Sequence, residues 1–336
     1  MSYKYFIIFY LIIIFIIINN IIYIIKKNIY NIDTFKNYKI IKTYSIMSMW
    51  KNYIYNDNFF TNLLKNNLIY KNKNDKIDFL IIGSFISKED FHFIQNKKCI
   101  KILYITEPIK FLSYYKYTYY LYKNNKFDYV IGCINNDISK NLIKHPLHLE
   151  KITINKDTFN NINKYVKNGI LNKKFCCMIA THDRWKTRIS IYEKIKNIDY
   201  IECPSKFKNN CSNKELNKIG NVEYIKNFIF NICSENSINN IDGYITEKIM
   251  NCCLAGAIPI YCGWLDNIDY QIFNKNRILY YNPNDEKSLL EVYNKVKDLM
   301  ENKEKLKIFY QQDVFMESAY NTIQQMKNNL LNIFNV

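Results

Sequence analysis

The chain has 336 residues, of which 47 are Lys or Arg and 30 are Asp or Glu, so its formal net charge is +17. Hydrophobic residues make up 49% and aromatic residues 16%, which excludes a disordered basic tail and provides apolar surface for about two domains. Arg occurs only at Arg184, Arg188 and Arg277, whereas Lys, Asn, Ile and Tyr are abundant. A single Lys is therefore weak evidence of function, and an Arg, Gly, Trp or Pro is more informative.

Residues 6–25 form the first predicted element, a membrane-spanning helix. Sixteen of these positions are Ile, Phe or Leu, and about 20 apolar residues suffice for a helix to cross a bilayer core. At roughly −0.3 to −0.6 kcal/mol each, they favour insertion by more than Asn19 and Asn20 oppose it. A cleaved signal peptide is the main alternative. Because the run is long and no small-x-small site follows it, we expect residues 1–27 to be a retained single-pass anchor.

The sequence leaves the orientation of this anchor open. Lys4 precedes the span, and five Lys follow it: Lys26, Lys27, Lys36, Lys39 and Lys42. The positive-inside rule would then leave the body of the protein in the cytoplasm. An enzyme that acts in the lumen of a Golgi-type or other intracellular compartment would need the reverse orientation. The cysteines do not decide between these, because adjacent pairs at Cys176–Cys177 and Cys252–Cys253 are typical of small buried hydrophobic residues. No CxxC spacing indicates a metal site.

A polar stem over residues 28–45 and an α/β domain over residues 46–155 are expected next. Short apolar runs bounded by polar or Gly residues predict buried strands in this domain, at 77–83, 99–105 and 127–131. Polar segments of helical length lie between them, at 87–96 and 110–123. Alternation of strands and helices at this spacing predicts a parallel sheet.

Residues 156–174 are rich in Lys and Asn and are predicted to be a linker. A second α/β domain over residues 175–300 follows, with strands expected at 175–180, 200–203, 227–233, 258–263 and 278–281. Helical spacing predicts a helix over 245–255 that ends at Gly256, and further helices over 301–336. Two such domains would face each other across a cleft, with ligands at the carboxyl ends of the strands.

The densest cluster of rare residue types begins at Asn231–Ser237 and continues through Gly243–Lys248 to Gly256–Ile260. A strand ends at the first run, and the second run opens a helix. Backbone N–H groups at a helix start, with Lys248 in the first turn, form an anion site suited to a diphosphate. Glu247 would accept hydrogen bonds from ribose hydroxyls, and Tyr244 would pack on a base or sugar face. An ordinary solvated helix start is the alternative reading.

Two strand ends supply further candidates. After the strand at 175–180 come Arg184 and Arg188, and Arg can clamp a phosphate through two hydrogen bonds more effectively than the Lys used elsewhere. Arg184 could take the place of Arg188 if the register of the loop differs, and His182 is expected to be a surface residue. After the strand at 99–105 comes Glu107, which is a candidate general base if it faces the cleft.

At these residues the sequence resembles the alpha-1,3-fucosyltransferases of glycosyltransferase family 10. The resemblance rests on the runs Phe228–Ser237, Gly243–Lys248 and Ala255–Tyr261, and it extends over roughly residues 77–281. It implies a GT-B fold, with two Rossmann-like domains facing a cleft, and transfer of fucose from GDP-fucose with inversion. The acceptor would be a hydroxyl, O3 of a GlcNAc or Glc residue, on a glycan or glycoprotein.

The resemblance also implies roles for individual residues. Glu107 would be the catalytic base, and the donor would be bound by Arg188, Asn236, Tyr244, Glu247 and Lys248. Asn236, Tyr244 and Glu247 would hold ribose, fucose or base. No metal is expected, which agrees with the lack of an Asp-x-Asp pair in the sequence.

Two alternative functions remain at this level. One is another GT-B transferase that uses a different nucleotide sugar, which donor competition would distinguish. The other is a membrane-anchored basic protein without catalytic activity, which would bind polyanions in a salt-sensitive way without selectivity for sugar nucleotides. Because the Lys residues are scattered and form no stripe with stacking aromatic residues, we expect no nucleic-acid partner.

Overall fold

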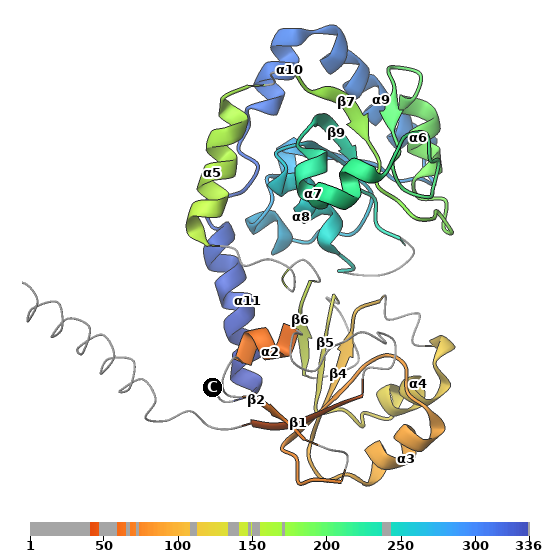
Figure 1. Cartoon of the computed structure of the whole chain (residues 1–336), viewed down its shortest axis with the longest axis vertical. Helices are drawn as coiled ribbons and strands as arrows, with labels where there is room; N and C mark the ends of the chain where they lie inside the picture. Colours follow the sequence, from red (N-terminus) through yellow and green to blue (C-terminus); the bar gives the residue numbers. More distant parts are fainter. Residues whose placement is uncertain are drawn as a thin grey trace, which may run out of the picture.

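The computed structural model describes residues 41–46, 59–64, 68–71, 74–107, 113–133, 141–146, 149, 155–169, 172–236 and 243–334. These residues form two α/β domains, each built on its own parallel sheet (Figure 1). The predicted anchor at residues 6–25 lies outside this part of the chain. Within the described residues, no helix is both long and apolar enough to cross a bilayer.

The first domain contains a six-stranded sheet with the order β2-β1-β3-β4-β5-β6, in which all neighbours are parallel. Its strands are β1 (Ile41–Ile46), β2 (Leu68–Tyr70), β3 (Phe79–Ile82), β4 (Ile100–Ile105), β5 (Tyr129–Gly132) and β6 (Leu142–Lys144). Its helices are α2 (Phe59–Leu64), α3 (Lys88–Asn96) and α4 (Lys116–Lys123). The three predicted strands are confirmed as β3, β4 and β5, because each apolar run is buried in the sheet.

The first domain begins earlier than the sequence indicates. Residues 41–45, which were expected in the stem, form most of β1, and β1 lies between β2 and β3. Its inward-facing side chains include Thr43 and Ser45, which are buried although polar. Buried Ile, Thr and Ser alternate here with partly buried Lys42 and Tyr44, so the strand lacks the usual apolar signal.

The second domain contains a five-stranded parallel sheet with the order β11-β10-β9-β7-β8. The strands are β7 (Lys174–Cys177), β8 (Ile201–Glu202), β9 (Phe228–Ile232), β10 (Ile258–Tyr261) and β11 (Leu279–Tyr280), as predicted. The helices are α6 (Ile189–Ile195), α7 (Lys214–Ile225), α8 (Glu247–Leu254), α9 (Glu286–Glu301) and α10 (Lys303–Tyr310). The chain leaves β7 toward β8 and returns to β9 on the other side, so the strand order reverses beside β7. Open α/β sheets bind ligands at such a reversal.

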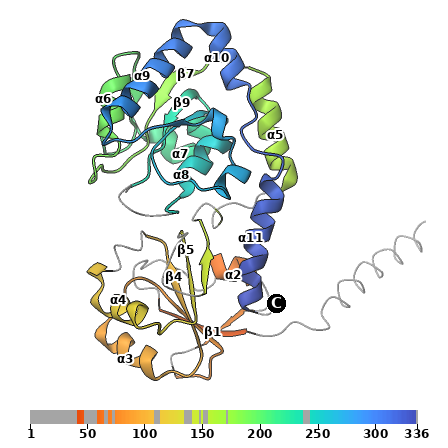
Figure 2. The ribbon, with the colours of Figure 1, turned by 180° about the vertical axis from the view of Figure 1, so that it is seen from behind.

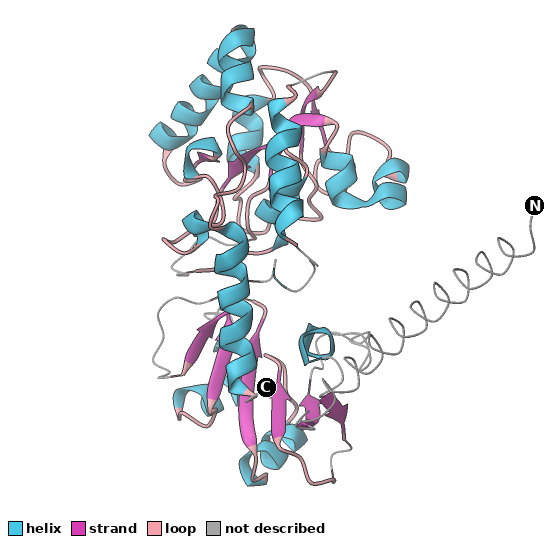
Figure 3. Ribbon diagram, turned by 90° about the vertical axis from the view of Figure 1, so that its left-hand side faces the viewer, coloured by secondary structure: helices cyan, strands magenta, loops and turns pink. Residues whose placement is uncertain are grey.

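The two domains are connected by helical segments that the sequence assigns only in part. Most of the predicted linker is a helix, α5 (Lys156–Lys167), which buries Phe159 and Val166 beside the second domain. The last helix, α11 (Ala319–Ile333), extends from the second domain to the first sheet (Figure 2). There Leu330 and Phe334 pack in one apolar cluster with residues of β3 and β4, and Figure 3 shows the helix crossing the face of that sheet.

Candidate active site

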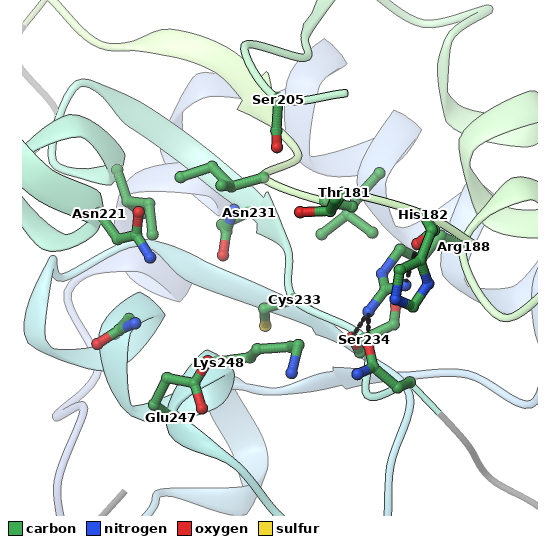
Figure 4. Close-up of a pocket in the computed structure, with 16 residues that line it drawn as sticks. Thr181, His182, Arg188, Ser205, Asn221, Asn231, Cys233, Ser234, Glu247 and Lys248 are labelled. Atoms are coloured by element: carbon green, nitrogen blue, oxygen red, sulfur yellow. Dashed lines mark hydrogen bonds between the residues drawn. The ribbon is translucent and has the colours of Figure 1, made fainter. Parts of the chain in front are cut away.

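A cavity lies at the carboxyl ends of β7 and β9, at the reversal of the strand order. Its volume is about 260 Å³, and its walls come from the loops after β7, β8 and β9 and from the start of α8. Figure 4 shows the side chains around it. Four of the predicted donor-binding residues line this cavity: Arg188, Asn236, Glu247 and Lys248. The cavity thus combines two cationic side chains with polar groups on the walls.

Arg188 is buried and joins the loops that follow β7 and β9. Its NH1 donates to the carbonyl of His182 (2.7 Å), and its NH2 donates to the carbonyl of Ser234 (2.9 Å) and to Oδ1 of Asn236 (2.7 Å). These three bonds use three of the five N–H donors of the guanidinium. Arg188 therefore fixes the cavity wall and keeps donor capacity for an anion.

Asp183 holds Arg188 in this position, although no motif in the sequence marks it as a site residue. The side chain of Asp183 is only 2% exposed. Its carboxylate accepts from the backbone N–H groups of Arg188 (3.1 Å) and Ile189 (2.8 Å), so it caps the start of α6. The signal that could have found it is the Asp five residues before the Arg, at the end of a buried strand.

Two further residues of this loop, Arg184 and His182, are both exposed but differ in their position relative to the cavity. Arg184 is exposed and is absent from the described lining of the cavity, so the structure favours Arg188 over Arg184 as the inward-facing Arg. His182 is exposed, as predicted, but it also lines the cavity. Desolvation together with the charges of Arg184 and Arg188 lowers the pKa of His182, which keeps its imidazole neutral at pH 7.

The start of α8 is built around a buried carboxylate, Glu235. Its oxygens accept from the backbone N–H of Thr246 (2.8 Å), from the hydroxyl of Thr246 (2.7 Å) and from Nζ of Lys248 (3.3 Å). Nζ of Lys248 also donates to the Thr246 hydroxyl (2.9 Å), so two of its three donors are used and the third can bind an anion in the cavity. The Glu235 carboxylate thus orients the ammonium of Lys248, a role that the sequence did not reveal.

Two glycines permit the backbone turns on either side of this helix. Gly243 has a φ of 91° in the turn that precedes it, and Gly256 has a φ of 69° directly after its C-cap Ala255. Residues that carry a side chain rarely adopt such φ angles. The predicted helix start at Thr246 and the predicted end at Gly256 are confirmed, with Thr246 as the N-cap.

Glu107 reaches this site from the other domain. It lies two residues beyond the end of β4, and its carboxylate accepts a hydrogen bond from the hydroxyl of Tyr244. Burial raises the pKa of Glu107 above its ordinary value, while the charge of Lys248 and the Tyr244 hydrogen bond lower it in part. Tyr244 is 2% exposed, and burial raises the pKa of its phenol well above 10, so it remains a donor at neutral pH.

Four of the six predicted site residues line the cavity, whereas Glu107 and Tyr244 are absent from its lining. Glu107 and Tyr244 are in contact, and the charge of Lys248 acts on Glu107 from the edge of the cavity. The negative charges of Glu235 and Glu247 raise the pKa of Glu107 further. A carboxylate with a raised pKa beside a cationic cavity can take a proton from a bound hydroxyl.

In the described ranges, no group of three or more His, Cys, Asp or Glu is placed to hold a metal ion. All ten cysteines lie in the described part of the chain and are free thiols, and eight of them are buried, in agreement with their predicted role as small core residues.

Comparisons with known proteins point to one family. Residues 171–330 match the model of the C-terminal part of glycosyltransferase family 10 (fucosyltransferase). An alpha-(1,3)-fucosyltransferase of Helicobacter pylori is 23% identical over 169 residues, which cover 41% of this chain and 34% of that protein. The match therefore spans about a third of the length of this relative.

Solved structures share the whole two-domain arrangement. A crystal structure of an alpha1,3-fucosyltransferase with GDP-fucose has a TM-score of 0.60 at 17% identity, and it covers 88% of this chain and 91% of that chain. A second crystal structure of an alpha1,3-fucosyltransferase has a TM-score of 0.62 at 16% identity, with the same coverage. These likenesses show the GT-B fold, and the family model assigns residues 171–330 to the C-terminal part of glycosyltransferase family 10, the fucosyltransferases.

Proposed function

We propose that the protein is an inverting fucosyltransferase that moves fucose from GDP-fucose to a hydroxyl of an acceptor glycan. The observation that carries this proposal is the approach of Glu107, from the first domain, to Tyr244 and Lys248 at the donor cavity of the second. The family of the chain and the GDP-fucose in a related structure support the choice of donor.

Inversion requires a single in-line displacement. Glu107 takes the proton of the acceptor hydroxyl, the new C–O bond forms at the anomeric carbon of fucose, and the bond from that carbon to the diphosphate oxygen breaks. The electron pair leaves with GDP. Arg188 and Lys248 stabilise the charge that develops on the diphosphate, which lies at the start of α8. Glu247 and Asn236 hold the ribose or the fucose at the same cavity.

The acceptor and the membrane attachment follow as parts of the proposal. The acceptor hydroxyl is O3 of a GlcNAc or Glc residue in a glycan or glycoprotein, by similarity to the alpha1,3-specific relatives. Residues 6–25 anchor the protein in an intracellular membrane as a single-pass helix. Carbonate extraction of cell membranes tests the second point, since an anchored protein stays in the pellet and a peripheral protein is released.

A direct assay tests the reaction. The full-length chain in detergent is incubated with GDP-fucose and with glycans that end in GlcNAc or Glc, and release of GDP is followed. We expect turnover with at least one acceptor, and the same rate after treatment with EDTA. Absence of GDP binding together with absence of turnover on every acceptor would refute the proposal. Stronger competition by a UDP- or ADP-sugar than by GDP would support the alternative transferase.

Tyr244→Phe is expected to shift the pH dependence of turnover. The hydroxyl of Tyr244 stabilises ionised Glu107, so its removal raises the pKa of Glu107. The acidic limb of the kcat profile should then move to higher pH, while the rate at high pH stays close to that of the wild type. Tyr224→Phe, which removes a hydroxyl bonded to Glu202 elsewhere in the second domain, is the control. An unchanged acidic limb in Tyr244→Phe would show that Glu107 is not the titrating base.

A further inference from the structure

Three neighbouring strands of the first sheet each end on the second domain. Glu107 follows β4 and meets Tyr244. Cys133 follows β5, and its Sγ donates to the carbonyl of Ile245 (3.1 Å). Because the carboxyl ends of parallel strands lie along one edge of a sheet, these contacts form a row, and the next position in the row is the end of β6.

The end of β6 supplies a charged contact of a different kind. Nζ of Lys144 lies 2.7 Å from Oδ2 of Asp266 and 2.8 Å from Oδ2 of Asp269, both in the loop between β10 and β11 of the second domain. The side chain of Lys144 is 14% exposed and that of Asp269 is fully buried. Burial raises the pKa of Asp269 only to about 6 because Lys144 opposes it, so both carboxylates are ionised at neutral pH.

The two carboxylates are also held by backbone N–H groups of their own loop. Oδ1 of Asp266 accepts from the backbone N–H groups of Ile268 (2.9 Å) and Asp269 (3.1 Å), and Oδ2 of Asp269 accepts from the backbone N–H of Asp266 (3.0 Å). The loop is therefore a rigid receptor for one ammonium group. A geometry of this kind fixes the position of the strand end that carries the cation.

The bridge adds a charged contact to the others that join the two domains. Helix α11 ties the domains together through its packing on the first sheet, and Glu107 and Cys133 contribute hydrogen bonds at the neighbouring strand ends. A contact between two charged groups holds its partners more strongly than a hydrogen bond between neutral groups. The angle between the domains decides where Glu107 lies relative to the donor cavity, because the cavity walls belong to the second domain alone.

We propose that Lys144, held by Asp266 and Asp269, is a positioning residue that sets the angle between the two domains and thereby places Glu107 over the donor site. This inference rests on the proposed function for its catalytic consequence. The bridge touches none of the cavity residues, so it acts on the reaction only through the placement of Glu107.

Two substitutions test the role of the bridge in turnover. Lys144→Met and Asp266→Asn are each expected to lower kcat by about 10- to 100-fold, since a misplacement of about 1 Å can cost 10²-fold. The Kd for GDP should stay within about twofold of the wild type. The kcat of the double variant should be little lower than that of either single variant, because both substitutions remove the same interaction. Lys305→Met breaks an exposed ion pair with Asp298 inside the second domain and should leave kcat unchanged.

Hydrogen exchange of the full-length chain provides a readout that does not depend on activity. In Lys144→Met, peptides that cover residues 243–249 and 263–272 should exchange faster, while those from α9 should not change. If Lys144→Met fails to fold, Asp266→Asn decides, since it keeps the shape of the side chain. Wild-type kcat in a folded variant overturns the proposal. If the wild type itself lacks fucosyltransferase activity, unchanged exchange at 243–249 overturns the role of the bridge on its own.

Discussion

Glu107→Gln is expected to reduce turnover of GDP-fucose by a factor of about 10² to 10⁴, the usual contribution of a general base. The amide keeps the size of the side chain but cannot accept the proton of the acceptor hydroxyl. Because the cavity walls lie in the second domain, the affinity for GDP should stay within about twofold of the wild type. Steady-state kinetics and calorimetric titration with GDP measure the two quantities separately.

The pH dependence provides a second test of Glu107. The base must be ionised to act, and its pKa lies above the ordinary value, so wild-type turnover should fall as the pH drops through that raised pKa. This acidic limb should disappear from the residual rate of Glu107→Gln. Glu89→Gln, at an exposed carboxylate in the first turn of α3, is the matched control and should retain the limb. A loss of GDP affinity in Glu107→Gln would instead assign Glu107 to donor binding.

Arg188→Ala is expected to have the largest combined effect on stability and donor binding. It leaves the carbonyls of His182 and Ser234 without their charged donor and leaves buried Asp183 without its cation. Removing one partner of a buried charged pair costs about 3 to 5 kcal/mol. Urea unfolding should therefore show a lower midpoint, and GDP affinity should fall at least about tenfold at a pH where the variant is folded.

Arg188→Lys separates the two effects. A Lys keeps the positive charge but cannot donate to three acceptors in one plane, so GDP affinity should still fall. Arg184→Ala is the control, because Arg184 is exposed and should change neither property. GDP affinity equal to that of the wild type in Arg188→Lys would mean that charge alone matters at this position. A strong loss in Arg184→Ala would restore the alternative Arg.

Apolar strands inside the two sheets were predictable from the sequence, whereas elements with many polar residues were not. The core strands β3 and β10 are continuous apolar runs, and β4 and β9 are interrupted only by Lys101 and Asn231, so all four stand out in this composition. Helix α5 was taken for a linker because its exposed face is Lys and Asn. Its buried residues Phe159 and Val166, together with partly buried Ile162, nevertheless follow the helical spacing of three and four positions.

Site residues that belong to a sequence motif were predictable, whereas residues that only orient another side chain were not. Arg188 stands out because Arg is rare in this chain, and Lys248 stands out because it lies at a predicted helix start. Asp183 and Glu235 only orient these cations, and their role depends on contacts between segments far apart in sequence, such as Glu235 with Thr246. The rarity of Arg was a reliable signal in a further case, since Arg277 is buried and donates to the carbonyls of Gly256 and Ala257.

The packing of α11 on the first sheet determines when that sheet can be completed during synthesis. Ile333 and Phe334 belong to the same apolar cluster as Phe79 and Ile102, although the whole second domain lies between them in the sequence. Domains usually fold in the order in which they emerge from the ribosome. Here the first domain must wait, with part of one apolar face uncovered, until the second domain has been synthesised. We therefore expect the second domain to reach its native state first and to present its final helix to the waiting sheet.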